Sequence, residues 1–371
     1  MVNFYLPSKE HCDAIVEASD SFIKKEMIWN GFETVQYNYR VPKYSDFHEF
    51  KAWELRGLTF VYDGKGNWTR HLMLHKFFNV YETPENQYHI LKNKGIQRVQ
   101  EKLDGSMIRF VRFPDGNWFA KTKFAFESDQ ASAANKILDN DPELLDFLEY
   151  CESNDCSPIF EYVSPDNKVV IQYYDDKLEL LQIRDNKTGE YKRFRSQCNY
   201  YSEAYQFAAL QDYRTFNDYL KKADDDEVEE FEGWVITFDD GHMAKLKTNW
   251  YVLNHRLIED FSRIDYIIEN TVNETIDDIL AKIKDDEFQA HVEYKRDKFL
   301  TWFNNKVSNI SFLTSQYTGD RKAFAIQFRE REDFSVIMNA LDNGAQSAVK
   351  RYVLKRIRTL SGANLLYEEM K

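Results

Sequence analysis

The sequence predicts an α+β protein in which an antiparallel, hairpin-rich domain (1–252) is followed by an all-α domain (253–371). Two observations carry this prediction. Short apolar runs joined by Gly, Asn or Asp turns recur through the first two thirds of the chain, and all seven prolines lie at or before Pro165. From about residue 252, apolar residues recur at three- and four-residue spacing instead, which is typical of helices.

The first domain is expected to contain hairpins rather than alternating strands and helices. Turn sequences such as YDGKGNW and FPDGNW separate β-rich runs, and such turns favour antiparallel pairing. Helical patterns interrupt these runs at about 128–151 and 201–222. The expected strands lie within 55–63, 106–113, 117–124, 168–174, 178–185, 232–238 and 242–248.

The C-terminal helices carry two features of interest. The segment ETIDDIL (274–280) resembles a helix start, because acidic residues in a first turn offset the helix dipole. Further on, Arg351, Lys355 and Arg358 recur at spacings of four and three. Such a run is compatible with a solvated face or with a grip on an RNA backbone, and the residues alone leave both open.

The composition argues against several classes of function. The 371-residue chain is 43% hydrophobic and has a formal net charge of −13, which argues against non-specific coating of long nucleic acid. It contains no long uncharged apolar run and no N-terminal signal peptide, so we expect no membrane partner. The four cysteines do not form a disulfide or zinc pattern, which favours reduced thiols in a cytoplasm.

A lysine beside an Asp-Gly turn raises the question of a nucleophile. In KLDGS (102–106), Lys102 is compatible with a plain hairpin turn. It is also compatible with nucleophilic chemistry, provided that nearby cations or desolvation favour its free amine. Such cations would also bind a polyphosphate. The candidates are Arg56, Lys76, Lys121, Lys123, Lys245 and Lys247.

Two carboxylates stand out beside these basic residues. Glu161 lies inside the otherwise apolar run IFEYV, where an acidic residue is uncommon. Glu232 opens EGWVI, and the following Gly233 would let the backbone approach a ligand closely. Each signal is weak by itself, and the order of the whole set is the stronger evidence.

The ordered set resembles motifs of the covalent nucleotidyltransferases, which comprise DNA ligases, RNA ligases and mRNA capping enzymes. The finer resemblance is to the RNA ligase 1 family of T-even-like bacteriophages. It covers about residues 30–255, and no OB-fold barrel pattern follows. The motifs are YNY (37–39), RG (56–57), KFFN (76–79), KLDGS (102–106), FEYVSP (160–165), EGWVI (232–236), KLK (245–247) and WYV (250–252).

The resemblance implies an adenylyltransferase domain and an ATP- and Mg²⁺-dependent ligase for RNA. In this reading the enzyme joins 5′-phosphate and 3′-hydroxyl ends through lysyl-AMP and adenylylated RNA. Single-stranded RNA or a tRNA anticodon loop would be the partner, in RNA repair. We expect a monomer in the cytoplasm, which would be the host cytoplasm if a phage encodes the chain.

The resemblance also assigns roles to residues. Lys102 would be the nucleophile, in a loop shaped by Asp104 and Gly105. The implied catalytic set is Lys102, Glu161, Glu232, Lys245, Lys247 and Tyr251. The implied nucleotide contacts also include Tyr37, Arg56, Lys76, Phe78, Asp104, Gly105, Gly233 and Lys121, with Lys121 favoured over Lys123. By register, Asp277 and Asp278 match an acidic pair implicated in metal binding.

Other functions remain open at this stage. A DNA ligase or a GTP-dependent capping enzyme shares the motifs, but both resemble this chain less because no barrel follows. A non-catalytic RNA-binding module that kept the fold is an alternative of another class. The joint presence of Lys102, Glu161 and Glu232 with the KLK pair argues against it.

Overall fold

A computed structural model describes residues 4–192, 215–225, 227–228, 230–281, 283 and 286–370. The chain divides into two compact units, Met1–Val252 and Leu253–Lys371. The first is built on antiparallel sheets and the second is helical, so the predicted fold class is confirmed. Most of the predicted helix 201–222, together with Cys198, lies outside the described residues.

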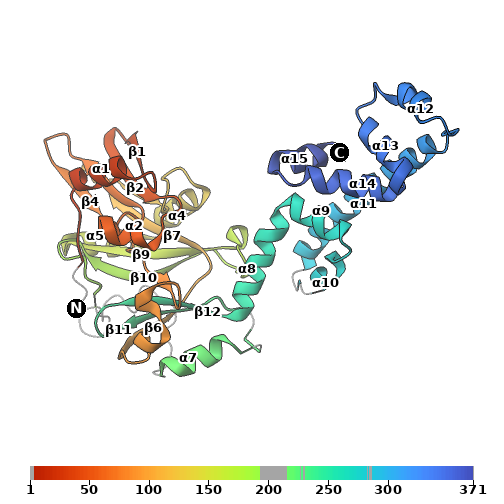
Figure 1. Ribbon diagram of the computed structural model, residues 1–371. Coiled ribbons are helices and arrows are strands. Elements are labelled where there is room, and N and C mark those ends of the chain that lie inside the picture. The colour runs from red at the N-terminus through yellow and green to blue at the C-terminus, as the bar shows by residue number, and fades with distance from the viewer. Residues whose placement is uncertain are drawn as a thin grey trace. The chain divides into compact units, whose positions relative to one another are not determined.

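Three four-stranded sheets form the first unit (Figure 1). All strand pairs are antiparallel except β12 with β5. The first sheet, in order, contains β1 (Phe22–Trp29), β2 (Phe32–Tyr39), β3 (Leu58–Tyr62) and β4 (Trp68–His71). The second contains β10 (Lys177–Asp185), β9 (Cys156–Val163), β7 (Ser106–Arg112) and β8 (Trp118–Lys121). The third contains β5 (Phe78–Asn79), β12 (Met243–Lys247), β11 (Gly233–Phe238) and β6 (Ile96–Glu101).

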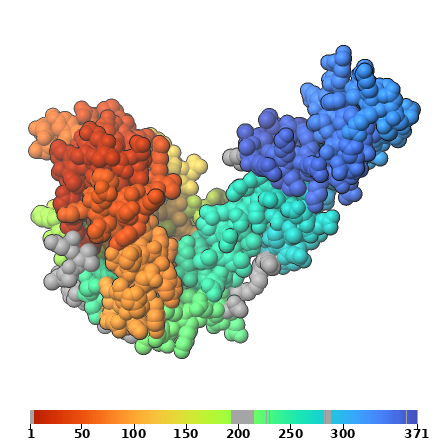
Figure 2. Space-filling model, in the orientation of Figure 1, coloured from red at the N-terminus to blue at the C-terminus, as the bar shows by residue number. Residues whose placement is uncertain are grey.

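Helices cover these sheets and fill the connections. Leu144, Phe147 and Leu148 of α5 are buried in one core with Phe110 and Phe160 of the second sheet. Residues of the first hundred positions, red to orange in Figure 2, make up one continuous part of the surface of this unit. The helices are α1 (Lys9–Ala18), α2 (Tyr44–Phe50), α3 (Tyr88–Leu91), α4 (Asp129–Asn140), α5 (Pro142–Ser153) and α7 (Phe216–Ala223), with short 3₁₀ turns at Pro84–Asn86 and Pro165–Asn167.

Two predicted elements differ in the structure. The helix expected over 128–151 is two helices, because Asp141 caps the second one and Pro142 occupies its first position. The strand expected over 168–174 is absent. The backbone N–H groups of Val170 and Ile171 donate to the carboxylate of Asp104 instead, so they are not available for a strand ladder.

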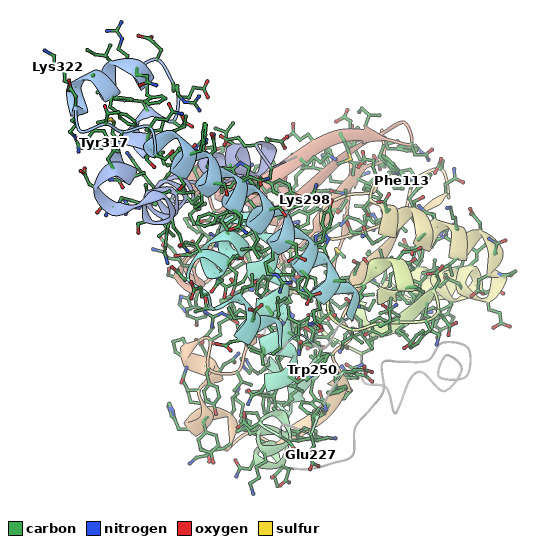
Figure 3. The ribbon with its side chains drawn as sticks, turned by 90° about the vertical axis from the view of Figure 1, so that its right-hand side faces the viewer. Phe113, Glu227, Trp250, Lys298, Tyr317 and Lys322 are labelled. Carbon is green, nitrogen blue, oxygen red and sulfur yellow. The ribbon has the colours of Figure 1, made fainter. Side chains whose placement is uncertain are left out.

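The second unit is a set of packed helices. Ile268, Phe299, Ile337, Val349 and Val353 are buried in its largest core cluster. Figure 3 shows Lys298 on the long helix α11, with Tyr317 and Lys322 near the end where that helix finishes. The elements are α8 (Asn249–Ser262), which begins in the first unit, α9 (Ile264–Val272), α10 (Ile276–Leu280), α11 (Asp286–Thr314), α12 (Arg321–Phe328), α13 (Phe334–Asn343), α14 (Ala345–Arg356) and α15 (Leu360–Glu368).

Two further expectations concern the whole chain. Within the described residues, no helix is both long enough and apolar enough to cross a membrane. Cys12, Cys151 and Cys156 are buried and form no disulfide.

Candidate active site

A cavity of about 450 Å³ opens between the second and third sheets of the first unit. Ser106, Met107 and Glu161 line it from the second sheet, while Val235 and Lys245, which are paired across β11 and β12, line it from the third. Lys102 lies on its wall, directly after β6 ends. Residues of KLDGS, FEYVSP, EGWVI and KLK therefore converge on one cavity.

Lys102 is held by two contacts with the start of β11. Its backbone N–H donates to the carbonyl oxygen of Gly233 at 2.9 Å. Its Nζ lies 2.7 Å from Oε2 of Glu232, and the Nζ of Lys247 lies 3.2 Å from Oε1 of the same carboxylate. Glu232 is only 1% exposed, whereas the Lys102 side chain is 22% exposed. The carboxylate therefore anchors an amine that still reaches the cavity.

The loop after Lys102 is fixed by Asp104, which is buried. Oδ2 of Asp104 accepts hydrogen bonds from the N–H groups of Val170 and Ile171 at 2.7 and 2.9 Å. Oδ1 accepts one from the hydroxyl of Tyr251 at 2.7 Å. Neither Asp104 nor Tyr251 lines the cavity. Through these hydrogen bonds both residues help to position the loop that follows Lys102.

Two glycines matter for reasons of close packing. A Cβ on Gly105 would lie 2.3 Å from the carbonyl oxygen of Tyr162, so the loop can approach β9 only with glycine there. Gly233 has φ +141°, and its Cβ would lie 2.0 Å from the carbonyl oxygen of Leu246. Glycine at this position therefore allows the close approach of the neighbouring strand β12, which leaves no room for a side chain.

Four basic side chains gather around one side of the site. Burial lowers the pKa of Lys123 to about 8, with Arg56 and Lys76 adding to the effect. Burial likewise lowers the pKa of Lys245 well below its usual value, again assisted by Arg56 and Lys76. Burial also lowers the pKa of Lys76, and the charge of Glu82 opposes this shift. Such a set of partly desolvated cations matches a polyanionic ligand.

Glu161 is the acidic counterpart inside the cavity. Burial raises its pKa to about 7, and the charges of Glu232 and Asp104 act in the same direction. Lys102 and Arg56 oppose this effect. Its neighbour across β9 and β10, Glu179, also has a raised pKa because of burial. Glu161 is thus a carboxyl whose charge is sensitive to what the cavity binds.

Two residues expected to contact the nucleotide lie elsewhere. Lys121 is fully buried, and its Nζ donates to the carbonyl oxygen of Gly57 at 2.9 Å. Tyr37 is also fully buried, and its hydroxyl donates to Asp13 at 3.0 Å. The polar ends of both residues are used in internal hydrogen bonds, so the structure does not bring Lys121 or Tyr37 to the cavity wall.

Lys123 is the lysine of the AKTKF segment that reaches the cavity, where Lys121 was expected. It lines the cavity, and its Nζ lies 3.8 Å from the ring centroid of Tyr39. The signal was present in the segment AKTKF, where both lysines share one face of a strand. In the structure β8 ends at Lys121, so Lys123 lies in the turn that follows and not on the strand.

Phe77 was not singled out from the sequence, although it forms part of the cavity wall. The charged ends of Arg56 and Lys245 lie 5.6 and 4.9 Å from its ring centroid. Its neighbours Lys76 and Phe78 line a second, adjoining cavity instead. In an extended chain, neighbouring residues point to opposite sides, so the alternation in KFFN could have indicated that Phe77 faces a different side from Lys76 and Phe78.

Asp277 and Asp278, expected to bind metal, lie in the first turn of α10. Asp277 forms an ion pair with Arg296 at 3.1 Å. Among the described residues, no cluster of three or more His, Cys, Asp or Glu could hold a metal ion. The position of the pair suits the helix dipole, and Asp277 is further held by its ion pair with Arg296.

Comparison with known proteins places this geometry in a family. A family model described as RNA ligase matches residues 54–251, more than half of the chain. The chain belongs to the RNA ligase family. The matched segment contains every residue that lines the cavity, from Arg56 to Lys245, and also Glu232 and Tyr251.

A curated relative supports the RNA ligase assignment over a longer stretch. The chain is 26% identical over 336 residues to a Thermovibrio ammonificans protein named "Putative RNA ligase", covering 87% of this chain and 84% of the relative. Solved structures resemble it more distantly. An archaeal ATP-dependent RNA ligase matches with a TM-score of 0.47 and 10% identity, covering 91% of this chain and 94% of its own. A Naegleria gruberi RNA ligase with pyrophosphate matches with a TM-score of 0.35 and 20% identity, covering 45% and 54%.

Proposed function

We propose that the chain is an ATP-dependent RNA ligase that joins a 5′-phosphate end to a 3′-hydroxyl end. Membership of the RNA ligase family supports RNA as the substrate. The observation that carries the chemistry is the position of Lys102, whose amine lies at the cavity wall 2.7 Å from the buried Glu232. A lysine amine is a suitable nucleophile when such neighbours orient it.

In the first step the unprotonated Nζ of Lys102 attacks the α-phosphorus of ATP. An N–P bond forms, the bond between the α-phosphorus and the bridging oxygen breaks, and pyrophosphate leaves. Oε2 of Glu232, 2.7 Å from the amine, is positioned to accept the proton that the amine loses. Charge that develops on the phosphate oxygens is stabilised by Lys245, Arg56 and Lys123, which line the same cavity.

In the second step an oxygen of the RNA 5′-phosphate attacks the lysyl-AMP phosphorus. The N–P bond breaks, the amine of Lys102 regains a proton, and adenylylated RNA results. In the third step the 3′-hydroxyl of the other end attacks the 5′-phosphate and releases AMP. Glu161, whose raised pKa allows it to donate or accept a hydrogen bond near neutral pH, is proposed to hold the ribose hydroxyls of the adenosine.

Mg²⁺ is compatible with this cavity. It is usually bound by one or two carboxylates together with substrate phosphates and water, so a dedicated protein cluster is not required. Glu101 and Glu161 are the carboxylates on the cavity wall, so they are the residues from which the chain would supply a ligand. When bound, the ion neutralises the polyphosphate.

We further propose that the helical unit contributes to RNA binding and that the reaction repairs broken RNA. Arg351, Lys355 and Arg358 are all exposed, which supports a contact with an RNA backbone. The repair role and a tRNA substrate rest on the resemblance of the motifs alone.

The reaction is tested with labelled oligonucleotides. Ends made of RNA or DNA are offered with ATP or GTP in the presence of Mg²⁺, and the joined product is separated by gel electrophoresis. The proposal predicts joining of RNA ends with ATP. Preferential joining of DNA ends, or activity with GTP alone, would contradict it and indicate another nucleotidyltransferase class.

A further inference from the structure

A second cavity, of about 600 Å³, adjoins the active-site cavity within the first unit. Phe77 lines both, so one aromatic ring forms part of the wall between them. Segments far apart in the sequence build the second cavity, including Tyr44 of α2, Trp53, Lys76 and His242. Its volume falls within the range of sites that hold small ligands.

Aromatic rings held in fixed contact form one wall of this second cavity. The ring of Phe78 lies 5.6 Å from that of Tyr44 and 5.9 Å from that of Trp53, between centroids and in edge-to-face geometry. The hydroxyl of Tyr44 donates to Glu85, which fixes its ring further. Rigid aromatic surfaces of this kind stack nucleobases without a strong preference for sequence.

The charges around the second cavity favour an anion. Lys51 and Lys76 both line it. Of its two carboxylates, Glu54 is neutralised by Arg184 and Glu85 accepts a hydrogen bond from Tyr44, so two lysines face one carboxylate without a cationic partner on the wall. The Nζ of Lys76 lies 4.4 Å from the centroid of Phe78, beside the aromatic wall. A ring and a phosphate could therefore bind next to each other here.

The chemistry of AMP transfer indicates which nucleotide belongs there. Displacement at phosphorus occurs with the entering and leaving groups in line. The RNA 5′-phosphate that displaces Lys102 must therefore enter from the side on which pyrophosphate left. The cations available to hold these phosphates are Arg56 and Lys123 of the first cavity and Lys76, which perturbs the pKa of Lys123 and lines the second.

We propose that the second cavity binds the 5′-terminal nucleotide of the 5′-phosphorylated RNA strand, with its base on the Tyr44–Trp53 wall and its phosphate beside Lys76. This inference rests on the proposed ligase function and adds the site of its RNA substrate. It also gives Lys76 and Phe78, which the motif resemblance implied as contacts of ATP, a role in binding RNA.

The test is equilibrium binding of a fluorescent ten-nucleotide RNA to the full chain, measured by anisotropy. The strand carries either a 5′-phosphate or a 5′-hydroxyl. Tyr44→Ala and Tyr5→Ala, which truncate rings on the cavity wall, are each expected to weaken binding of the phosphorylated strand about tenfold. Lys76→Met is expected to remove the preference for the 5′-phosphate.

A matched control is Tyr150→Ala on α5, because Tyr150 is 46% exposed, like Tyr5 at 45%, and lines neither cavity. Its RNA affinity is expected to equal that of the wild type. Tyr5 lies at the surface, so its truncation keeps the test valid if Tyr44→Ala fails to fold. Equal RNA affinity in Tyr5→Ala, Tyr150→Ala and the wild type would overturn the inference, as would equal affinity of the wild type for the two strands.

The same samples separate this inference from the ligase proposal. Intact mass after incubation with ATP and Mg²⁺ reports lysyl-AMP independently of RNA. A wild type without the adduct would contradict the ligase chemistry, whatever the RNA affinities. A wild type with the adduct, whose affinity for RNA is unchanged by Tyr5→Ala and Tyr44→Ala, would contradict only the RNA site.

Discussion

The Nζ of Lys102 lies 2.7 Å from Oε2 of Glu232, a carboxylate that is 1% exposed. The same carboxylate also pairs with Lys247 at 3.2 Å. A buried carboxylate between two ammonium groups fixes the direction of each. This arrangement gives the candidate nucleophile one orientation before any substrate binds.

Glu232→Gln tests whether this carboxylate serves the nucleophile. The amide is similar in shape, but it cannot accept the proton of the amine or pair with two ammonium groups. We expect the initial rate of lysyl-AMP formation to fall about 100-fold or more, as for loss of a general base. The rate is measured by intact mass over time. A variant that folds normally and reacts at the wild-type rate would show that Glu232 has only a structural role.

Glu161→Gln should change how stability depends on pH. The pKa of Glu161 is raised to about 7 by burial, so the folded state holds a proton that the unfolded state has lost at intermediate pH. Its contribution to stability is present below the ordinary carboxyl pKa and is lost as the pH rises through about 7. At pH 8 we expect the variant to be more stable than the wild type by on the order of 1–2 kcal/mol, and at pH 4 the gain should vanish. Chemical denaturation of the ligand-free protein at both pH values measures this, and a gain that is equal at both would contradict the assignment.

Lys123→Met and Lys121→Met form a matched pair that separates the two lysines of AKTKF. Lys123 lines the cavity, so its loss should raise the KM for ATP in adenylylation about tenfold, as expected for loss of one charged contact. Lys121 is buried beneath the site and bonded to Gly57, so its replacement should leave the KM unchanged. The reverse pattern would restore Lys121 as the phosphate contact.

The double variant Asp277→Asn, Asp278→Asn tests the metal role that the motif resemblance implied. Both residues lie in the first turn of α10, and Asp277 pairs with Arg296. We expect the Mg²⁺ concentration for half-maximal adenylylation to stay at its wild-type value. A rise of tenfold or more would indicate that these carboxylates do bind the metal.

Much of the fold could be predicted from local pattern. Alternating apolar residues and Asp-Gly or Asn turns indicated hairpins such as β7–β8 and β11–β12, because register and turn are encoded locally. The conformation of the segment 168–174 could not be predicted from local pattern. Its N–H groups are taken by Asp104, a residue more than sixty positions earlier, and such a tertiary contact leaves no local signal.

At the site, too, local motifs were predictable and tertiary arrangement was not. The order of KLDGS, FEYVSP, EGWVI and KLK was sufficient to name Lys102, Glu161 and Lys245, all of which line one cavity. The sequence could not show which lysine of AKTKF reaches the cavity, because the side of a strand is readable from sequence, whereas the residue at which the strand ends is not. The second cavity was invisible, because it is built from segments that only tertiary packing brings together.

The central claim is that Lys102 accepts AMP from ATP. Protein first stripped of bound AMP with pyrophosphate is incubated with ATP and Mg²⁺, beside a Lys102→Ala variant, and the intact masses are compared. We expect the wild type to gain roughly 329 Da, the mass of one covalent AMP on a nucleophilic lysine, and the variant to gain nothing. A wild type without this adduct, or a Lys102→Ala variant that still forms it, would contradict the account.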